Sequence, residues 1–159
     1  MQIIYQPIGT LYSPHKSIAD MPIQPSGADG VTGTISLEPQ YLEGLKDLNG
    51  FSHIYVLYHF HQAGVAQLTV TPFMDSSSHG IFATRAPRRP NSIGLSVLKL
   101  NNIVGHLLQV ENVDILNETP ILDIKPYVPD FDHIQVEKTG WLDRAKGGVK
   151  KQRSDNRFA

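Results

Sequence analysis

The sequence predicts a mostly β fold: a small, single-domain antiparallel β-barrel with one short helix. Short stretches rich in β-branched and aromatic residues recur along the chain, separated by proline and glycine turns. One stretch is predicted to be helical, and Ser92–Leu100, whose pattern alone fits a strand or a helix, is predicted to be a strand because Pro90 and Gly94 disfavour a helix. Roughly six to eight short strands with few crossovers argue against a doubly wound sheet and favour a barrel. The 159 residues fit one domain with a core of useful size.

The N-terminal part of the chain shows strand signals on both sides of a long loop. Ile3–Tyr5 and Ile8–Leu11 are short and β-rich, with proline or glycine nearby. Ser13–Gly30 is rich in proline and glycine and lacks periodicity, which predicts a long loop, and long ordered loops often carry function. Val31–Leu37 alternates apolar and polar residues, as a half-buried strand does.

The predicted helix and the most apolar strand follow. Glu38–Leu48 has apolar residues at helical spacing, and Gly50 comes next as a stop signal. Phe51–Phe60 is aromatic and β-branched almost throughout, which predicts a strand buried on both faces. Further strands are predicted at Leu68–Thr71, Ser92–Leu100, Leu107–Leu116 and Pro120–Lys125.

The C-terminal part is predicted to differ from the barrel. The apolar content falls after Pro129, so we expect a barrel domain over residues 1–137 and a basic tail over residues 138–159. From Arg144 onward, lysine and arginine side chains accompany two glycines, which predicts a segment that is mobile or pairs with another chain.

The composition excludes several classes of site. The chain has no cysteine, so disulfides, thiolate metal sites and a cysteine nucleophile are ruled out. The net charge of −1 gives no overall affinity for nucleic acid, which would have to bind a local basic patch. No signal peptide is recognisable, and no apolar run approaches the ~20 residues of a membrane span. We therefore expect a soluble cytoplasmic protein with no membrane partner.

Three segments place polar side chains among turn residues. In the first, His59 and His61 follow each other at a spacing that puts both on one face of a strand. Two such histidines suit a zinc site, but no third ligand stands at motif spacing, and polar residues that meet solvent at a strand end are the alternative.

The second segment carries three arginines within five residues. Arg85, Arg88 and Arg89 are framed by Pro87 and Pro90, which restrict the backbone. Preorganised guanidinium groups favour bidentate binding of carboxylates or phosphates, and a solvated basic loop is the alternative.

The third segment resembles a turn followed by a strand. Asp114, Asn117 and Thr119 bracket a predicted hairpin turn. Asp123 and Lys125 lie on one face of the following strand, where they can form an ion pair. A structural turn with a surface salt bridge is the alternative to a binding role.

Taken together, these segments resemble the TsaA-like family, whose best known activity is that of the TrmO-type tRNA methyltransferases. The match runs from about Ile3 to Asp132. Its motifs are Phe51-Ser-His-Ile-Tyr, His61-Gln62, Gly80-Ile-Phe-Ala-Thr-Arg85, Arg89-Pro-Asn-Ser-Ile-Gly94, Asp114-Ile-Leu-Asn117, Thr119-Pro120 and Asp123-Ile-Lys-Pro-Tyr127.

The resemblance implies a β-barrel homodimer that holds S-adenosyl-L-methionine near the subunit interface. The implied reaction adds a methyl group to N6 of a threonylcarbamoyl-adenosine beside the tRNA anticodon. The implied cofactor contacts are Pro25, Ser26, His61, Gln62, Arg85, Leu95, Asp114, Ile115, Leu116 and Asn117. No metal is implied.

The resemblance implies less directly which residues bind the substrate and which remove its proton. Arg88 and Arg89 are expected to bind the tRNA substrate. Tyr127 and Asp123 are the expected catalytic residues, since a carbamoylated N6 is a weak nucleophile that a base would help. His59 and Arg89 are further candidates.

One position departs from the family pattern. Glu118 stands where members commonly have glycine, in a turn that favours positive φ, so we expect a different turn or backbone strain. Two other functions stay open: a methyltransferase for another RNA or a small molecule, and a non-catalytic module that binds S-adenosylmethionine.

Overall fold

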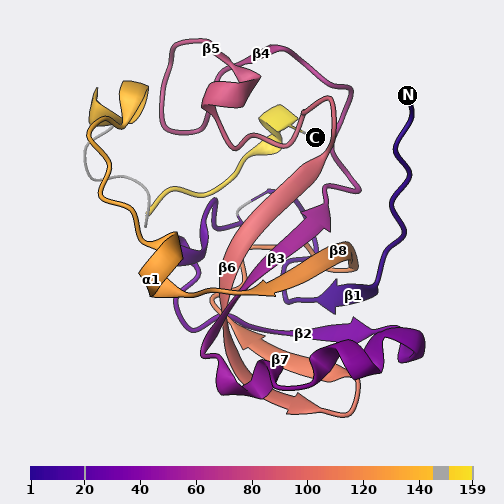
Figure 1. The fold of residues 1–159 in the computed structure, drawn as a ribbon. Coiled ribbons are helices and arrows are strands. Elements are labelled where there is room, and N and C mark those ends of the chain that lie inside the picture. Colours follow the sequence, from indigo (N-terminus) through magenta and orange to yellow (C-terminus); the bar gives the residue numbers. More distant parts are fainter. Residues whose placement is uncertain (20, 145–150, 159) are drawn as a thin grey trace.

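The protein is a closed antiparallel barrel of six strands, as the sequence predicts (Figure 1). The computed structural model describes residues 1–19, 21–144 and 151–158. Around the barrel the strand order is β1-β2-β7-β6-β3-β8. The strands are β1 (Gly9–Tyr12), β2 (Thr32–Leu37), β3 (His53–His59), β6 (Ile93–Val104), β7 (Leu107–Glu111) and β8 (Thr119–Pro126).

The alternation of the strands builds the core. Every second side chain of β3 is buried, namely Ile54, Val56 and Tyr58, while the intervening ones are partly or fully exposed. The prediction that this strand is buried on both faces is wrong, because a barrel has one inner face and the outward side chains of β3 keep partial or full exposure. The opposing strand β6 contributes Ser96 and Leu98 to the same interior.

Shorter elements lie outside the barrel. A two-stranded sheet joins β4 (Thr69–Val70) and β5 (His79–Gly80). The α-helix α1 spans Pro129–Asp132. The 3-10 helices are η1 (Pro25–Gly27), η2 (Pro39–Leu45), η3 (Leu48–Gly50), η4 (Ile81–Ala83), η5 (Gly140–Arg144) and η6 (Asn156–Phe158).

The structure corrects three local predictions. Residues 3–5 form no strand, and Ile3, Ile4 and Tyr5 are exposed. The helix expected at Glu38–Leu48 forms as the 3-10 helices η2 and η3, which fits the glycine within it. The segment between β7 and β8 is not a hairpin turn, because β7 pairs with β2 and β6 whereas β8 pairs with β1 and β3.

Among the described residues, none of the helices combines the length and the apolar character that a membrane crossing requires.

Candidate functional site

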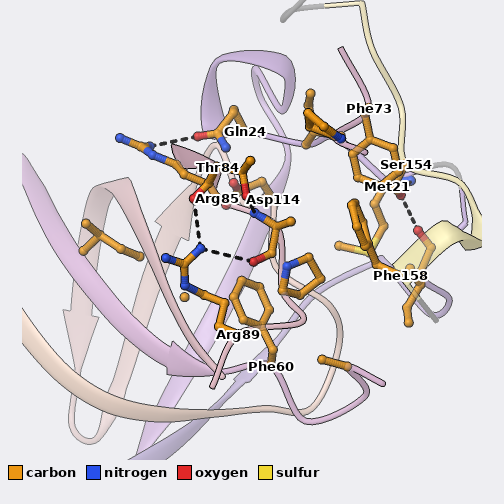
Figure 2. A pocket seen from close by; sticks show the side chains of 18 of the residues that line it. Met21, Gln24, Phe60, Phe73, Thr84, Arg85, Arg89, Asp114, Ser154 and Phe158 are labelled. Carbon is orange, nitrogen blue, oxygen red and sulfur yellow. Dashed lines mark hydrogen bonds between the residues drawn. The ribbon is translucent and has the colours of Figure 1, made fainter. Parts of the chain in front are cut away.

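A cavity of about 760 Å³ lies where β3 ends and β6 begins. Its walls come from segments that are far apart in the sequence, as Figure 2 shows for the labelled side chains. The long loop supplies residues 21–24, the β3 end supplies 58 and 60–63, and the arginine-rich loop supplies 82–87. The cavity is also lined by residues of β6, of the segment 114–119 and of the C-terminal part of the chain. These are Ile93, Gly94, Leu95, Asp114, Leu116, Thr119, Trp141, Leu142, Ser154 and Phe158.

Arg85 stands at the cavity with its guanidinium group exposed. Its Nη1 donates a hydrogen bond to Gln24 Oε1 at 3.1 Å, which links the two loops across the cavity (Figure 2). Gln24 directly precedes Pro25 and Ser26, which were expected to contact the cofactor but do not line the cavity.

Arg89 holds the loop that carries Arg85. Its Nη1 donates to the carbonyl oxygens of Ile81, Thr84 and Ala86, at 3.2, 2.9 and 3.4 Å. The residue lines the cavity, so its side chain both borders the site and shapes it. Arg88 does not line the cavity; its guanidinium group lies against Gly64, where an added Cβ would come within 2.9 Å of Nη2.

Asp114 is the acidic residue among those that line the cavity, and it is partly buried there. Ser96 Oγ donates to Asp114 Oδ1 at 2.7 Å, and Tyr58 Oη lies 3.2 Å from Ser96 Oγ. Burial raises the pKa of the Asp114 carboxyl to about 7, against the opposing effects of the Ser96 hydrogen bond and the Arg85 charge. This carboxyl therefore changes charge near neutral pH. Tyr58 and Ser96 were not identified from the sequence.

The segment that carries Asp114 is fixed by the opposite loop. Ser13 Oγ donates to the Ile115 carbonyl at 2.7 Å, and Ser13 N donates to Asn117 Oδ1 at 3.0 Å. Asn117 N donates to the His15 carbonyl at 2.8 Å. The side chain of Ile115 is fully buried in the core. Ile115 and Asn117 do not line the cavity, so both shape the turn rather than border the site.

His61 and Gln62 line the cavity as expected. Burial lowers the pKa of the His61 imidazole, and neighbouring His59 lowers it further, so the ring is neutral at physiological pH. His61 N donates to the His59 carbonyl at 2.8 Å, a tight turn that ends the strand alternation. The part of the chain that the structure describes contains no group of three side chains able to hold a metal ion.

The expected catalytic residues lie outside the cavity wall. The Asp123 carboxylate pairs with Lys125 Nζ at 2.7 Å, as the sequence indicated. The Tyr127 ring packs against Tyr55 with centroids 5.5 Å apart. Burial raises the pKa of the Tyr55 phenol, as do Asp132 and Tyr127, whereas the charge of Arg85 lowers it. The tyrosine pair therefore lies within the electrostatic range of Arg85.

Residues 151–158 form one wall of the cavity, and we refer to them as the C-terminal strap. Ser154 N donates to the Met21 carbonyl at 2.8 Å, and Met21 N donates back to Ser154 Oγ at 3.0 Å. Phe158 is buried among Val70, Ile81 and Ala86. The strap thus packs on its own chain, in contrast to the predicted mobile or intermolecular tail; the tail lysines 146 and 150 lie outside the described residues.

Comparisons with known proteins give a consistent result. A family profile described as the tRNA-methyltransferase O N-terminal domain matches residues 10–133. A probable S-adenosyl-L-methionine-binding protein of Pyrococcus abyssi is 49% identical over 158 residues, covering 99% of this chain and 86% of that protein. The tRNA (adenine(37)-N6)-methyltransferase of Rattus norvegicus is 32% identical over 140 residues, covering 84% of this chain and 32% of that protein.

The fold is also that of a solved structure. The crystal structure of TrmO from Pseudomonas aeruginosa superimposes with a TM-score of 0.75 at 36% identity, covering 89% of this chain and 63% of that one. The chain therefore spans most of the relative from Pyrococcus abyssi but less than two thirds of the relatives that are named as methyltransferases or TrmO.

Proposed function

This chain belongs to the tRNA-methyltransferase O family, and on that premise we propose that it binds S-adenosyl-L-methionine in the cavity described above. We further propose that it transfers the methyl group to N6 of a threonylcarbamoyl-adenosine beside the tRNA anticodon. The protein is in this view a cytoplasmic homodimer with the cofactor near the subunit interface.

The observation that carries the proposal is the pairing of opposite charges on one apolar cavity. Arg85 presents a guanidinium group and Asp114 a carboxyl group, while Phe60, Leu95 and Leu116 supply apolar surface. The cofactor has a carboxylate, an ammonium group, a ribose diol and an adenine ring. The guanidinium group suits the carboxylate, the carboxyl group suits the ammonium group or the ribose, and the apolar surface suits the adenine ring. The volume of about 760 Å³ falls in the roughly 300–1,000 Å³ range of small-molecule sites.

Each residue has a distinct part in this binding. Arg85 suits the carboxylate, because guanidinium and carboxylate form charge-assisted bidentate bonds. Asp114 suits the ammonium group or a ribose hydroxyl, and Leu95 and Leu116 suit the faces of the adenine. His61 and Gln62 add polar contacts, and the lowered pKa of His61 avoids a second positive charge beside a sulfonium. Pro25 and Ser26 contribute through Gln24, which they follow directly in the chain.

The chain needs to supply alignment and proton removal. When bound, S-adenosylmethionine provides an electrophilic methyl group on a sulfonium that leaves without acid assistance. Alignment of donor and acceptor contributes on the order of 7–11 kcal/mol to such reactions. N6 loses its proton as the carbon–nitrogen bond forms, and we assign the acceptor of that proton to the Asp123 carboxylate or to Tyr127 in its phenolate form, neither of which lines the cavity. Arg88 and Arg89 are assigned to the tRNA.

A non-catalytic S-adenosylmethionine-binding protein is the second candidate, and two observations favour it. The Pyrococcus abyssi relative, matched over most of its length, is named for binding alone. Basic side chains that would attract RNA are also occupied within the chain: Lys99 pairs with Glu111 at 3.3 Å, and Arg157 pairs with Asp155 at 2.8 Å.

The test has two stages. Calorimetric titration of S-adenosylmethionine into the purified protein should give saturable binding at one site per subunit. Methyl transfer is then measured on tRNA with and without the threonylcarbamoyl group, with the Arg85→Ala protein as a matched control. Transfer only to the modified tRNA is expected. Binding without transfer to either tRNA would establish the binding-protein alternative, and no binding would overturn both.

A further inference from the structure

A row of three polar groups leads from the barrel interior to the cavity. It begins at Tyr58, continues through Ser96 and ends at Asp114. Tyr58 and Ser96 are 6% and 2% exposed, so both hydroxyl groups lie inside the core rather than at the surface. Buried polar groups are costly unless they are satisfied, and here the partner of each is the next member of the row.

The strand register accounts for the geometry of the row. β3 and β6 pair antiparallel with Tyr58 opposite Gly94 and Val56 opposite Ser96. Tyr58 and Ser96 are thus diagonal neighbours on the inner face, a separation that a long aromatic side chain can span. The ring lies over Gly94, where an added Cβ would come within 2.3 Å of Tyr58 Cε2. Gly94 therefore leaves the space through which the phenol reaches Ser96.

When Asp114 is ionised, the hydrogens of the row can point in only one direction. Each hydroxyl group carries a single hydrogen. The Ser96 hydrogen is donated to Asp114 Oδ1 at 2.7 Å, so the hydrogen between Tyr58 Oη and Ser96 Oγ, 3.2 Å apart, comes from the tyrosine. Donors aligned toward a carboxylate stabilise its ionised form and fix the orientation of its oxygens.

We infer that Tyr58 and Ser96 are positioning residues that hold the Asp114 carboxylate, oriented and as a hydrogen-bond acceptor, for the cofactor. The inference rests on the proposed function of the cavity, and it assigns to the barrel core a part in ligand binding. Ser96 does not line the cavity and acts through Asp114, and the hydroxyl group of Tyr58, whose side chain borders the cavity, acts on Asp114 through Ser96.

Several other titratable or charged groups lie near Asp114. Arg85 and the buried phenol of Tyr58 face it, and His61 and Arg89 border the same cavity. Burial raises the pKa of Asp114 to about 7 although Ser96 and Arg85 both favour ionisation. Loss of the Ser96 donor therefore moves the carboxyl further toward its neutral form, which no longer accepts on both oxygens.

The first test is made without ligand. The carboxyl carbon of Asp114 is followed by ¹³C NMR from pH 4 to pH 10 in the wild type, Ser96→Ala and Tyr58→Phe. We expect the midpoint to rise by about one to two pH units in Ser96→Ala, since a hydrogen bond to a charged group is lost. Tyr58→Phe should show a smaller rise. Ser36→Ala, on β2 at the far side of the ring, is the matched control and should leave the midpoint unchanged.

The second test uses calorimetric titration of S-adenosylmethionine at pH 7 and pH 9. The affinity of Ser96→Ala relative to wild type should fall about tenfold at pH 7 and by a smaller factor at pH 9, where a larger fraction of the variant's carboxyl group is ionised. A role in packing alone would lower the affinity equally at both values.

Two results would overturn the inference. One is an Asp114 midpoint that does not move in Ser96→Ala, or moves as much in Ser36→Ala. The other is a loss of affinity that is as large at pH 9 as at pH 7. The NMR titration needs no ligand, so it separates a failure of this inference from a failure of the proposed cofactor site.

Discussion

Glu118 gives the sharpest prediction, because its backbone conformation is one that glycine adopts more easily. Its φ is +61°. For a residue with a Cβ, the left-handed region costs roughly 1–2 kcal/mol, and a glycine there loses about 0.5–1 kcal/mol through the entropy of the unfolded chain. The Glu118 side chain is exposed, so little packing is lost on its removal. The net effect of Glu118→Gly is a stabilisation of about 0.5–1 kcal/mol.

The measurement is thermal unfolding followed by circular dichroism at pH 7. A stabilisation of that size raises the midpoint by about 1–4 °C in a chain of this length. Asp47→Gly is the matched control: Asp47 has φ of +66°, is exposed and lies outside the cavity wall. The unfolding midpoint should rise in both variants, by less in Asp47→Gly because aspartate tolerates the left-handed region better than glutamate, and it should not rise in Glu118→Ala. A midpoint that is unchanged or lower in Glu118→Gly while it rises in Asp47→Gly would refute the reasoning.

Three further predictions concern the cavity. Arg85→Ala should weaken S-adenosylmethionine binding by at least about tenfold in calorimetry and leave the unfolding midpoint unchanged, because Arg85 is exposed; equal affinity would exclude it from the site. The pKa of Asp114 is about 7 in the folded chain and 3.8 in the unfolded one, so its contribution to stability is fully present below about pH 4, declines as the pH rises to about 7 and then levels off. Asp114→Asn should remove this decline, at most ~4 kcal/mol, from urea unfolding measured between pH 5 and pH 8; parallel pH profiles would contradict it. Phe158→Ala should release the C-terminal strap, at a cost of about 3 kcal/mol, so that amide exchange at Met21 speeds up about a hundredfold while exchange at Ile54 in the barrel does not change; equal acceleration at both would show that strap and barrel unfold together.

Local chemistry made part of the fold and site predictable. The barrel strands were predictable from the alternation of apolar and polar residues. This pattern depends only on the residues of each strand and on the single face that packs into the barrel. The place of Arg85 and Asp114 in the site was expected from the resemblance of their motifs to the family, since the residue pattern alone also fitted a solvated loop and a structural turn. A strained turn at Glu118 was expected from the family pattern, since glycine, which tolerates positive φ, commonly stands at that position.

Long-range pairing explains what the sequence did not predict. The row from Tyr58 to Asp114 depends on the register that sets Tyr58 opposite Gly94, and a shift by one residue would point Tyr58 outward. Residues 3–5 have strand propensity, but propensity forms no strand without a neighbour to pair with. The C-terminal strap looked like a polar tail, because a single Phe158 and backbone hydrogen bonds at Ser154 hold it in place.

The closure of the barrel affects the order in which the elements of the protein form during folding. The ring closes where β1 meets β8, with Gly9 paired to Ile121, so more than a hundred residues must be ordered before the last ladder forms. Pairings this distant are slow to form. The cavity takes walls from both sides of that closure, so it comes into existence late in folding. A ligand that binds there acts after the rate-limiting step: it should slow unfolding and leave the refolding rate as it was.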